Sequence, residues 1–306
     1  MIAAIAGQVI LVGALVAVAI HGLPLSAAGG GGKTSPTALP GTVPRARVNR
    51  FDAAAAMRVA KLQVDAGQRP AGSPTLRRLA TRLRAMLPGG RFEPVQGHPG
   101  LRNIVGELPG PGPVIVIGAH YDSESHPKGF VGANDAAAAV GVVIELSHAL
   151  GKLHRPADAP GVRFVLFDGE EEPRRTEDFY RDALRGSKAY VQIHAEELRA
   201  LVLLDYIGNR GVRLPKEGTS TASLWQQVRG AADRVGVGAV FPPQAGQSLF
   251  DDHTPFLRAR IPAVDLIDWG YRYKDTLQDT YDKLSADSVD AVGETVLELL
   301  RTWPAS

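Results

Sequence analysis

The sequence lacks cysteine altogether, and neither sign of charge predominates. Without cysteine among its 306 residues, the chain has no disulfides, no thiolate zinc site and no cysteine nucleophile, although this does not decide its redox compartment. The formal net charge is only +2, which gives no indication of a polyanionic partner such as nucleic acid. Four arginines on one expected helix fit a solvated helix face: Arg77, Arg78, Arg82 and Arg84.

The longest apolar run lies at the N-terminus, where Ile2–Ile20 is interrupted only by the amide of Gln8. As a helix, this run would reach roughly 28 Å, about the hydrocarbon thickness of a bilayer. An uncleaved membrane anchor and a removed signal peptide both fit residues 1–21. No Lys or Arg precedes the run, which favours an anchor, whereas the small residues Ser26–Ala28 would suit cleavage. Either alternative exports the following domain, which is then secreted or membrane-anchored.

The next segment changes in composition. Residues 22–48 are rich in Gly, Pro, Ser and Thr, and such a stretch buries too little apolar surface to offset its ordering entropy. We therefore expect a flexible linker over 22–48 and a single folded domain over 49–306, with its core beginning near Phe51.

Within that domain, short β-branched runs alternate with helical patterns. Runs such as Val114–Ile117 are typical of strands buried on both faces. The alternation predicts an α/β fold with a mostly parallel sheet covered by helices on both sides. The expected strands are Arg102–Leu108, Val114–Ile117, Val162–Phe167, Leu201–Leu204 and Ala263–Ile267. The expected helices are 52–66, 74–87, Ala136–Leu150, Gly186–His194, Ser223–Val235 and Ser285–Trp303.

Acidic residues and one histidine follow these strands. In open α/β sheets, ligands bind outside the carboxyl ends of the strands, so we expect side chains at those ends to converge. They are His120 and Asp122, then Asp168, Glu170 and Glu171, then Asp205, and finally Asp268 and Asp275. Asp135 stands immediately before a predicted helix.

Crowded carboxylates repel one another unless a cation holds them. No Lys or Arg stands in these motifs, so a divalent metal is the simplest explanation, and imidazole with carboxylates favours zinc, with manganese or cobalt as alternatives. Taken singly, Asp135 fits a helix N-cap and the Glu170–Glu172 run fits a solvated surface. Taken together, the motifs predict a metal site.

Seven segments in order resemble the M28 metallopeptidases and the related glutaminyl cyclases. They are Gly67–Ser73, Gly118–Ser123, Val131–Asp135, Phe167–Glu171, Leu203–Gly208, Asp251–Leu257 and Gln278–Ser285. The resemblance implies a three-layer αβα sandwich with a mixed, mostly parallel central sheet, as in zinc exopeptidases. It also implies an enzyme that acts on peptides.

The resemblance further implies roles for particular residues. His120 and Asp205 would bind one ion, Glu171 would bind a second, and Asp135 would bridge the two. Glu170 would act as the general base, because it neighbours a ligand yet remains able to accept a proton. A different set would support these groups: Asp122 would orient His120, Asp251 would belong to the catalytic groups, and His253 and Trp269 would lie near the substrate.

One position departs from the family pattern. Lys274–Thr280 matches a segment in which family members carry histidine directly before threonine, and here Asp275 stands in that place. Aspartate ligates zinc at a similar distance but has a shorter reach. Either Asp275 completes a second, all-oxygen site or only the His120 site binds metal, so one or two ions are expected.

Three functions are therefore compared. The first is a zinc exopeptidase that hydrolyses N-terminal peptide bonds, which the sequence favours. The second is a glutaminyl cyclase, supported by Asp251–His253 but lacking the aromatic wall and histidine that cyclases carry at positions 274 and 275. The third is a degenerate, membrane-tethered binding protein without catalysis.

Overall fold

The computed structural model describes residues 42–173 and 178–303, and its centre is a six-stranded mixed sheet in the order β1-β2-β4-β3-β5-β6. The strands β4, β3, β5 and β6 run parallel, whereas β2 pairs antiparallel with both β4 and β1. The strand bounds are β1 Arg91–Pro94, β2 Arg102–Leu108, β3 Val114–His120, β4 Val162–Phe167, β5 Leu198–Asp205 and β6 Ala263–Ile267.

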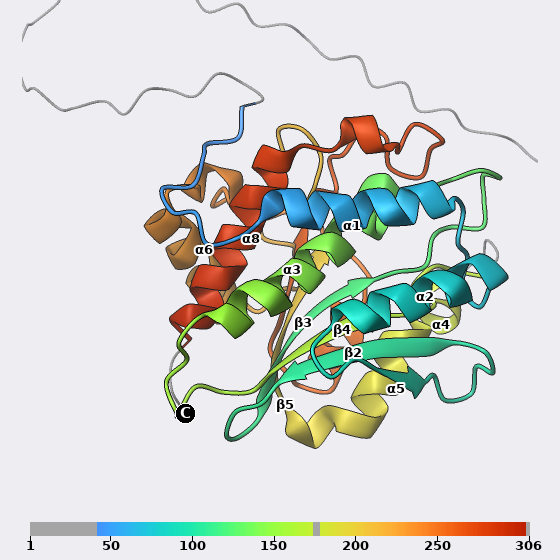
Figure 1. Cartoon of the computed structure of the whole chain (residues 1–306), viewed down its shortest axis with the longest axis horizontal. Helices are drawn as coiled ribbons and strands as arrows, with labels where there is room; N and C mark the ends of the chain where they lie inside the picture. Colours follow the sequence, from blue (N-terminus) through green and yellow to red (C-terminus); the bar gives the residue numbers. More distant parts are fainter. Residues whose placement is uncertain (1–41, 174–177, 304–306) are drawn as a thin grey trace, which may run out of the picture. The chain divides into compact units, whose positions relative to one another are not determined.

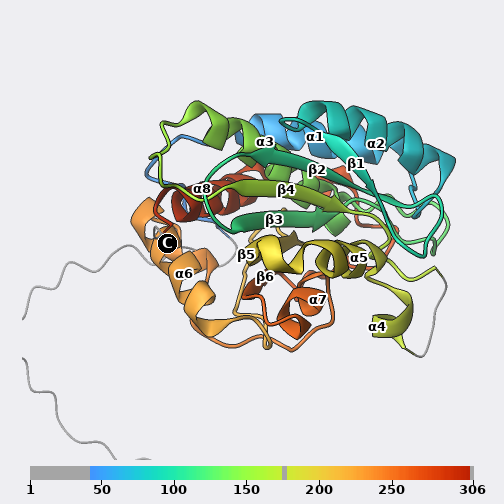
Figure 2. The same ribbon diagram turned by 90° about the horizontal axis from the view of Figure 1, so that it is seen from below.

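Helices cover both faces of this sheet (Figures 1 and 2). One face packs against α1, α2, α3, α6 and α8, and the other against α5 and α7. The bounds are α1 Ala53–Ala66, α2 Pro74–Met86, α3 Ala138–Lys152, α4 Phe179–Asp182, α5 Arg185–His194, α6 Ala222–Val235, α7 His253–Arg258 and α8 Ala286–Arg301. The three-layer αβα fold predicted from the sequence is confirmed.

The side chains of β3 show how the period-2 pattern builds the two interfaces. Successive strand residues point to opposite faces, so Ile115 and Ile117 join the core beneath α1, α3 and α8, while Val114 and Val116 join the core beneath α5 and α7. Both sets are buried. This is why the strand reads as an uninterrupted β-branched run.

Local signals set several helix starts. The Asp52 carboxylate accepts the Ala55 N–H at 2.9 Å and begins α1. Ser73 accepts the Leu76 N–H at 3.1 Å and, with Pro74 in the first turn, begins α2. The predicted long elements are therefore present near their expected bounds, whereas the short β1, α4 and α7 are additional to those predicted.

The end of the predicted linker contacts the domain. The Arg47 N–H donates to the Val235 carbonyl at 2.8 Å, and Val43 and Val48 pack against the core. The expected anchor or signal segment at 1–21 and most of the linker lie outside the described residues. Over 42–173 and 178–303, none of the helices has the length and apolar character needed to cross a bilayer.

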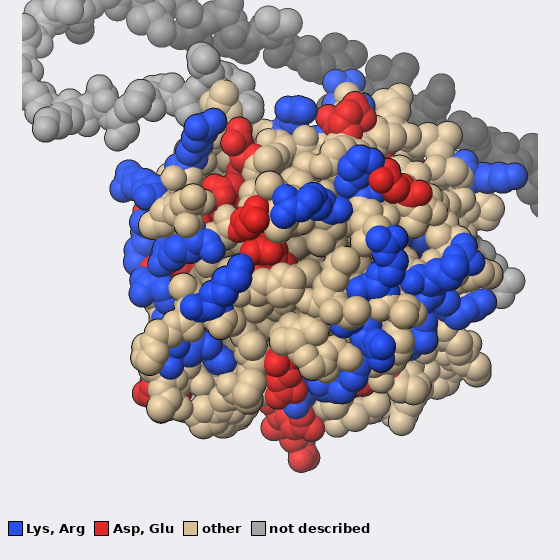
Figure 3. All heavy atoms as spheres, in the orientation of Figure 1, with Lys and Arg blue, Asp and Glu red and all other residues tan. Residues whose placement is uncertain are grey.

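The surface carries both signs of charge. Figure 3 shows Lys and Arg side chains over one face with Asp and Glu among them, and the basic side chains are densest over α2. Arg77, Arg78 and Arg82 are exposed there, and the Arg84 guanidinium lies 5.0 Å from the centre of the Phe92 ring.

The topology places a crevice at the ends of β3 and β5. After β3 the chain crosses through α3 to β4 on one side, and after β4 it crosses through α5 to β5 on the other side. Such a switch in strand order opens the space where open α/β folds bind ligands. β3 ends at His120 and β5 ends at Asp205, so the predicted ligands stand at this position.

Candidate metal centre

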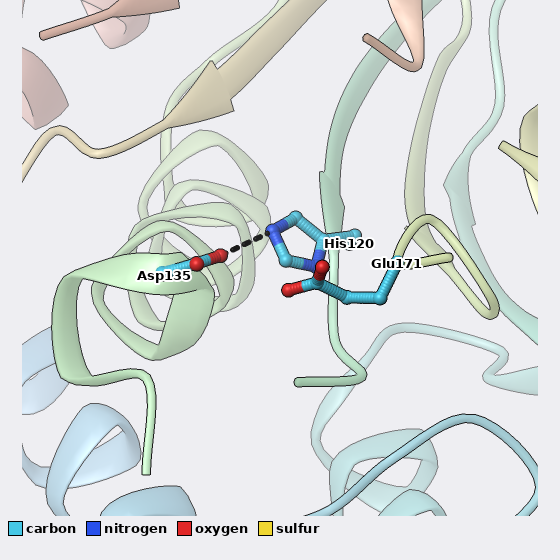
Figure 4. A group of neighbouring side chains, drawn as sticks. All are labelled: His120, Asp135 and Glu171. Carbon is cyan, nitrogen blue, oxygen red and sulfur yellow. Dashed lines mark ion pairs between the residues drawn. The ribbon is translucent and has the colours of Figure 1, made fainter. Parts of the chain in front are cut away.

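His120 lies at the centre of the acidic cluster (Figure 4). Its buried ring, at the end of β3, points Nε2 at two carboxylates, with Asp135 Oδ1 at 3.0 Å and Asp205 Oδ1 at 3.6 Å. Burial alone would lower the pKa of His120, but the carboxylates of Asp122, Asp135 and Asp205 raise it well above the usual value. The imidazole therefore stands in a strongly negative environment.

Asp135 is positioned by the wide helical turn Ala133–Ala137 that precedes α3. Gly132 begins this turn with φ of 51°, and a Cβ at this position would lie 1.9 Å from the Asp135 carbonyl oxygen, so only glycine fits. The buried Asp279 carboxylate accepts the N–H groups of Asn134 at 3.0 Å and Asp135 at 3.1 Å. Asp279 thus fixes the backbone that presents Asp135.

The carboxylate of Asp122 connects the His120 strand with the loop after β4. Its two oxygens accept the N–H of Glu170 at 3.2 Å and of Glu171 at 3.3 Å. The same carboxylate lies 3.7 Å from His120 Nδ1. A single buried acid therefore faces the histidine and holds the paired glutamates in place.

The ligand atoms of His120, Asp135 and Glu171 all lie within 4.8 Å of one another, and all three residues are buried (Figure 4). Glu171 Oε1 is buried without a hydrogen-bond partner among the described residues. Burial raises the pKa of Glu171 well above its usual value, and the Asp135 charge adds to this. One imidazole and two carboxylates at this spacing fit a divalent cation such as zinc.

Asp205 lies beside this group at the end of β5. Its Oδ1 accepts the N–H of Tyr206 at 2.8 Å. Burial raises the pKa of Asp205 to about 8, against the opposing effect of His120. The carboxylate lies 3.6 Å from His120 Nε2 but outside the group of three, so its role as a ligand stays a prediction.

Asp275 contacts Tyr206, which also contacts Asp135. The Tyr206 hydroxyl lies 2.8 Å from Asp135 Oδ2 and 3.0 Å from Asp275 Oδ1. Tyr206 has φ of 46°, a left-handed conformation that costs a bulky residue about 1–2 kcal/mol. Burial raises the pKa of Tyr206 well above its usual value, and the surrounding carboxylates raise it further.

Arg69 corrects the expectation that no basic side chain stands near these acids. It is fully buried, and its guanidinium donates to the carbonyls of Tyr121, Val131 and Gly132. Burial lowers the pKa of Arg69, while Asp135 and Asp122 act in the opposite direction. The arginine offsets part of the negative charge, but these hydrogen bonds go to the main chain, so the carboxylates still face one another.

Two of the strand-end acids do not converge on the site. Asp168 accepts the Arg102 N–H at 2.9 Å and the Tyr121 hydroxyl at 3.2 Å. Asp268 accepts the Asn209 side-chain amide at 2.9 Å and the Arg213 N–H at 3.1 Å. Both carboxylates therefore anchor neighbouring loops.

His253 lies in a second buried group with Asp251 and Asp265, whose potential ligand atoms also fall within 4.8 Å of one another. The His253 Nε2 lies 2.8 Å from Thr219 Oγ1 and 3.2 Å from Glu217 Oε2. The ring is fully buried, and His253 is absent from the described residues that line the cavity next to Asp135, Glu171 and Asp205. Its place next to the substrate remains a prediction without a contact to support it.

A cavity of about 380 Å³ brings most of the predicted residues together. Eight acidic residues line it: Glu124, Asp135, Glu170, Glu171, Glu172, Asp205, Asp251 and Asp275. Trp269 also lines it and is 36% exposed, with the Lys274 ammonium 3.7 Å from the centre of its ring. None of the described residues that line this cavity is Lys, Arg or His, so its lining suits a cationic group.

Three residues of the site were not predicted from the sequence. Tyr206, Asp279 and Arg69 all fall inside the segments that carry the family resemblance. Of the three, Asp279 could have been identified from the sequence, because it is an acid within a conspicuous motif. The phenol of Tyr206 and the guanidinium of Arg69 gave none, because their roles depend on which distant groups the fold brings to them.

We expect Asp279→Ala to destabilise the metal-free protein by roughly 3 kcal/mol or more, because it leaves buried hydrogen-bond donors without an acceptor. Those donors are the N–H groups of Asn134 and Asp135 and the Tyr271 hydroxyl at 2.8 Å. Urea unfolding in chelator measures the effect. Asp282→Ala, at an exposed acid nearby, serves as the control and should change stability by less than about 0.5 kcal/mol. Equal effects of the two substitutions would refute the role given to Asp279.

Known proteins resemble this chain in both sequence and fold. The Glutaminyl-peptide cyclotransferase-like protein of Mus musculus is 28% identical over 195 residues, which cover 54% of this chain and 50% of that protein. A leucine aminopeptidase precursor from Bacteroides thetaiotaomicron superposes with a TM-score of 0.74 at 25% identity, covering 85% of this chain and all of that one. Porphyromonas gingivalis glutaminyl cyclase gives 0.73 at 26% identity, covering 83% and 99%.

The match spans only about half the length of the curated cyclotransferase-like protein from mouse. The model of peptidase family M28 matches residues 103–300. These residues contain β2 except for its first residue, all of β3 to β6 and every predicted ligand. With the αβα fold and the buried His–Asp–Glu group, this match shows that the chain belongs to the M28 peptidase family.

Proposed function

We propose that this protein is a zinc-dependent enzyme that acts on the N-terminal residue of peptides, and that it cyclises N-terminal glutamine. The acidic cavity supports the first part of this proposal, action on the N-terminal residue. Its carboxylates attract the free α-amino group of a peptide and repel a C-terminal carboxylate. N-terminal rather than C-terminal processing is therefore the reaction that the charge distribution favours.

His120, Asp135 and Glu171 would hold the zinc ion, with Asp205 at 3.6 Å from the histidine as an additional ligand. When bound, zinc would polarise the carbonyl group of the substrate as a Lewis acid. Glu170 lines the same cavity, outside the group of three. It is thus available as an acid and base.

Cyclisation needs a group that takes up a proton and returns it. The α-amino nitrogen attacks the side-chain amide carbon of glutamine, the bond from that carbon to the amide nitrogen breaks, and ammonia leaves. Glu170 would accept the proton that the amine loses and deliver it to the departing nitrogen. Burial raises the pKa of Glu170 well above its usual value, partly offset by His120, so this carboxyl takes up a proton more readily than an exposed glutamate.

Two observations favour cyclisation over the hydrolysis preferred from the sequence. Curated relatives in mouse and in snakes are glutaminyl-peptide cyclotransferases or proteins like them. In addition, Asp251 lines the cavity with Glu170, and the two charges interact, so a second carboxyl stands next to the proposed proton carrier. Trp269 would supply an aromatic surface in place of the wall missing at 274 and 275.

Aminopeptidase activity is the second candidate. The similarity to the leucine aminopeptidase precursor supports it, and Glu170 would then remove a proton from an attacking water molecule.

The N-terminal apolar run adds a further element to the proposal, namely that the enzyme is exported and meets peptides outside the cytoplasm.

A peptide panel separates these activities. The full-length protein, loaded with zinc, is incubated with a glutamine-initiated peptide, its N-acetylated form and a leucine-initiated peptide, and the products are identified by mass spectrometry. We expect loss of ammonia from the first peptide only. Release of free N-terminal residues would replace cyclisation with the aminopeptidase proposal, and no product from a zinc-loaded protein would refute both.

A further inference from the structure

We propose that a second cavity, next to the acidic one, binds a carboxylate of the peptide substrate. That carboxylate is an acidic side chain or the C-terminus of a short peptide. The inference rests on the proposed action on peptide N-termini and names the substrate class, namely peptides that carry a negative charge a few residues after the N-terminus.

The lining of this basic cavity is opposite in charge to that of the acidic cavity. The cavity has a volume of about 560 Å³, and four basic residues line it: Arg210, Arg213, Arg272 and Lys283. Trp269 lines the acidic cavity and the next residue, Gly270, lines the basic one. The segment after β6 therefore separates a strongly negative site from a positive one.

The single acid among the described residues of this lining does not neutralise it. Asp268 is buried, and its Oδ2 already accepts the Asn209 side-chain amide at 2.9 Å and the Arg213 main-chain N–H at 3.1 Å. Its charge is thus directed at uncharged donors of the protein. The basic side chains stay in excess in the cavity.

The guanidinium groups of this cavity are available to a ligand. Arg210, Arg213 and Arg272 are exposed, and within residues 42–173 and 178–303 none of the three forms an ion pair with a carboxylate. Lys283 pairs with its neighbour Asp282. A guanidinium offers two parallel N–H donors that match the two oxygens of a carboxylate, so these arginines suit an acidic group of a peptide.

A row of three tyrosines connects the two cavities. The ring centres of Tyr206 and Tyr271 lie 6.0 Å apart, and those of Tyr271 and Tyr273 lie 5.7 Å apart. Tyr206 lines the acidic cavity and Tyr273 lines the basic one. The first and third rings are therefore within about 12 Å of each other, a distance that about four residues of extended chain span.

The far end of this row gathers positive charge. The Arg272 guanidinium lies 5.1 Å and the Lys283 ammonium 5.3 Å from the centre of the Tyr273 ring, and an aromatic ring attracts cations at such distances. At the other end, the Tyr206 hydroxyl contacts Asp135. A peptide whose α-amino group enters the acidic cavity can therefore place a carboxylate at about its fourth residue beside these cations.

Peptide binding to the zinc-loaded, full-length Glu170→Gln variant tests this proposal without turnover. Three amidated pentapeptides begin with glutamine and carry Glu, Gln or Lys as the fourth residue. A glutamine-initiated tetrapeptide with a free or an amidated C-terminus distinguishes a terminal carboxylate from a side chain. Isothermal titration calorimetry gives each Kd at low and at high salt.

Two matched charge reversals are each added to this variant. Arg213→Glu/Arg272→Glu changes the basic cavity, and Arg78→Glu/Arg82→Glu makes the same change at exposed arginines of α2 that line neither cavity. All four side chains are exposed, so the folded state should tolerate both sets. The second set reports the effect of net charge alone.

We expect the Glu peptide to bind about fivefold more tightly than the Gln peptide, and the Lys peptide about fivefold more weakly, as for an exposed ion pair. The free tetrapeptide should bind more tightly than its amide. High salt should reduce these differences. Arg213→Glu/Arg272→Glu should reverse the order of the pentapeptides, and Arg78→Glu/Arg82→Glu should keep it.

Equal Kd values within both peptide sets would overturn the inference. An unchanged order in Arg213→Glu/Arg272→Glu, or the same change in both double variants, would also overturn it. A preference in only one peptide set would support the subsite and identify which carboxylate it binds. Charge preference without any product in the peptide panel would refute the proposed reaction alone, and binding of no peptide would refute both proposals.

Discussion

Glu170→Gln is expected to lower kcat/KM by about 10³-fold while leaving the zinc content unchanged, because losing a general acid–base typically costs 10²–10⁴-fold. Glutamine has nearly the same shape as glutamate but does not accept the proton that either proposed reaction releases. Glu170 lies outside the group of three ligand atoms, so removing its charge should not remove the ion. Steady-state kinetics and metal analysis on the same sample make this comparison.

The control for this substitution is Glu196→Gln, at an exposed glutamate in the connection before β5. It makes the same chemical change away from the cavity and should retain wild-type kinetics. Two results would contradict the role of Glu170. Activity above a tenth of the wild-type value would mean that another group carries the proton, and loss of zinc would mean that Glu170 is a ligand.

The fold followed from the sequence because its signals are local. Val114–Ile117 and Val162–Phe167 read as doubly buried strands, and both are central strands of the sheet. The carboxyl ends of parallel strands share one edge, so His120 and Asp205 were expected to meet. They do, at 3.6 Å, from positions on adjacent strands.

The remaining features of the site depend on side-chain directions that strand-end position does not fix. Asp168 and Asp268 directly follow buried strands, and Asp205 is the last residue of β5, yet Asp168 and Asp268 each bond to a neighbouring loop. Asp279 supports a turn 144 residues earlier in the chain through the Asp135 N–H. The hydroxyl of Tyr206 reaches Asp135 over a separation of 71 residues. No periodic pattern encodes such contacts, because they arise only when distant loops pack together.

A common physical logic connects these residues. Asp122, Asp279 and Arg69 use buried polar groups to fix the main chain around the ligands, whereas Asp135, Glu171 and Asp205 face one another across a small space. The first set is satisfied by hydrogen bonds, whereas the second set is satisfied only in part, because Glu171 Oε1 is buried without a hydrogen-bond partner among the described residues. Rigid support around an unsatisfied acidic centre is the arrangement that a metal site requires.

The strongest test of this logic is Asp135→Asn, which should change stability in opposite directions with and without zinc. A substitution that disturbs only the surrounding residues of a metal site weakens affinity by roughly 10–100-fold, so neutralising a direct ligand should weaken zinc binding by at least about 100-fold. In the metal-free protein the same change removes one of the mutually repelling charges. Burial is the main cause that raises the pKa values of Glu171 and Asp279, and the charge of Asp135 raises both further. Both groups should therefore ionise more easily in the variant.

The expected result is therefore a crossing of melting temperatures. In chelator, Asp135→Asn should melt at or above the wild-type temperature, because the buried carboxylates repel one another less in the folded state. With excess zinc, the melting temperature of the wild type should rise by several degrees while that of the variant stays nearly unchanged, since only a protein that binds the ion is stabilised by it. Differential scanning fluorimetry at pH 7.5 with either addition measures all four values. If the variant melts below the wild type under both conditions by the same amount, Asp135 supports the fold and does not bind metal.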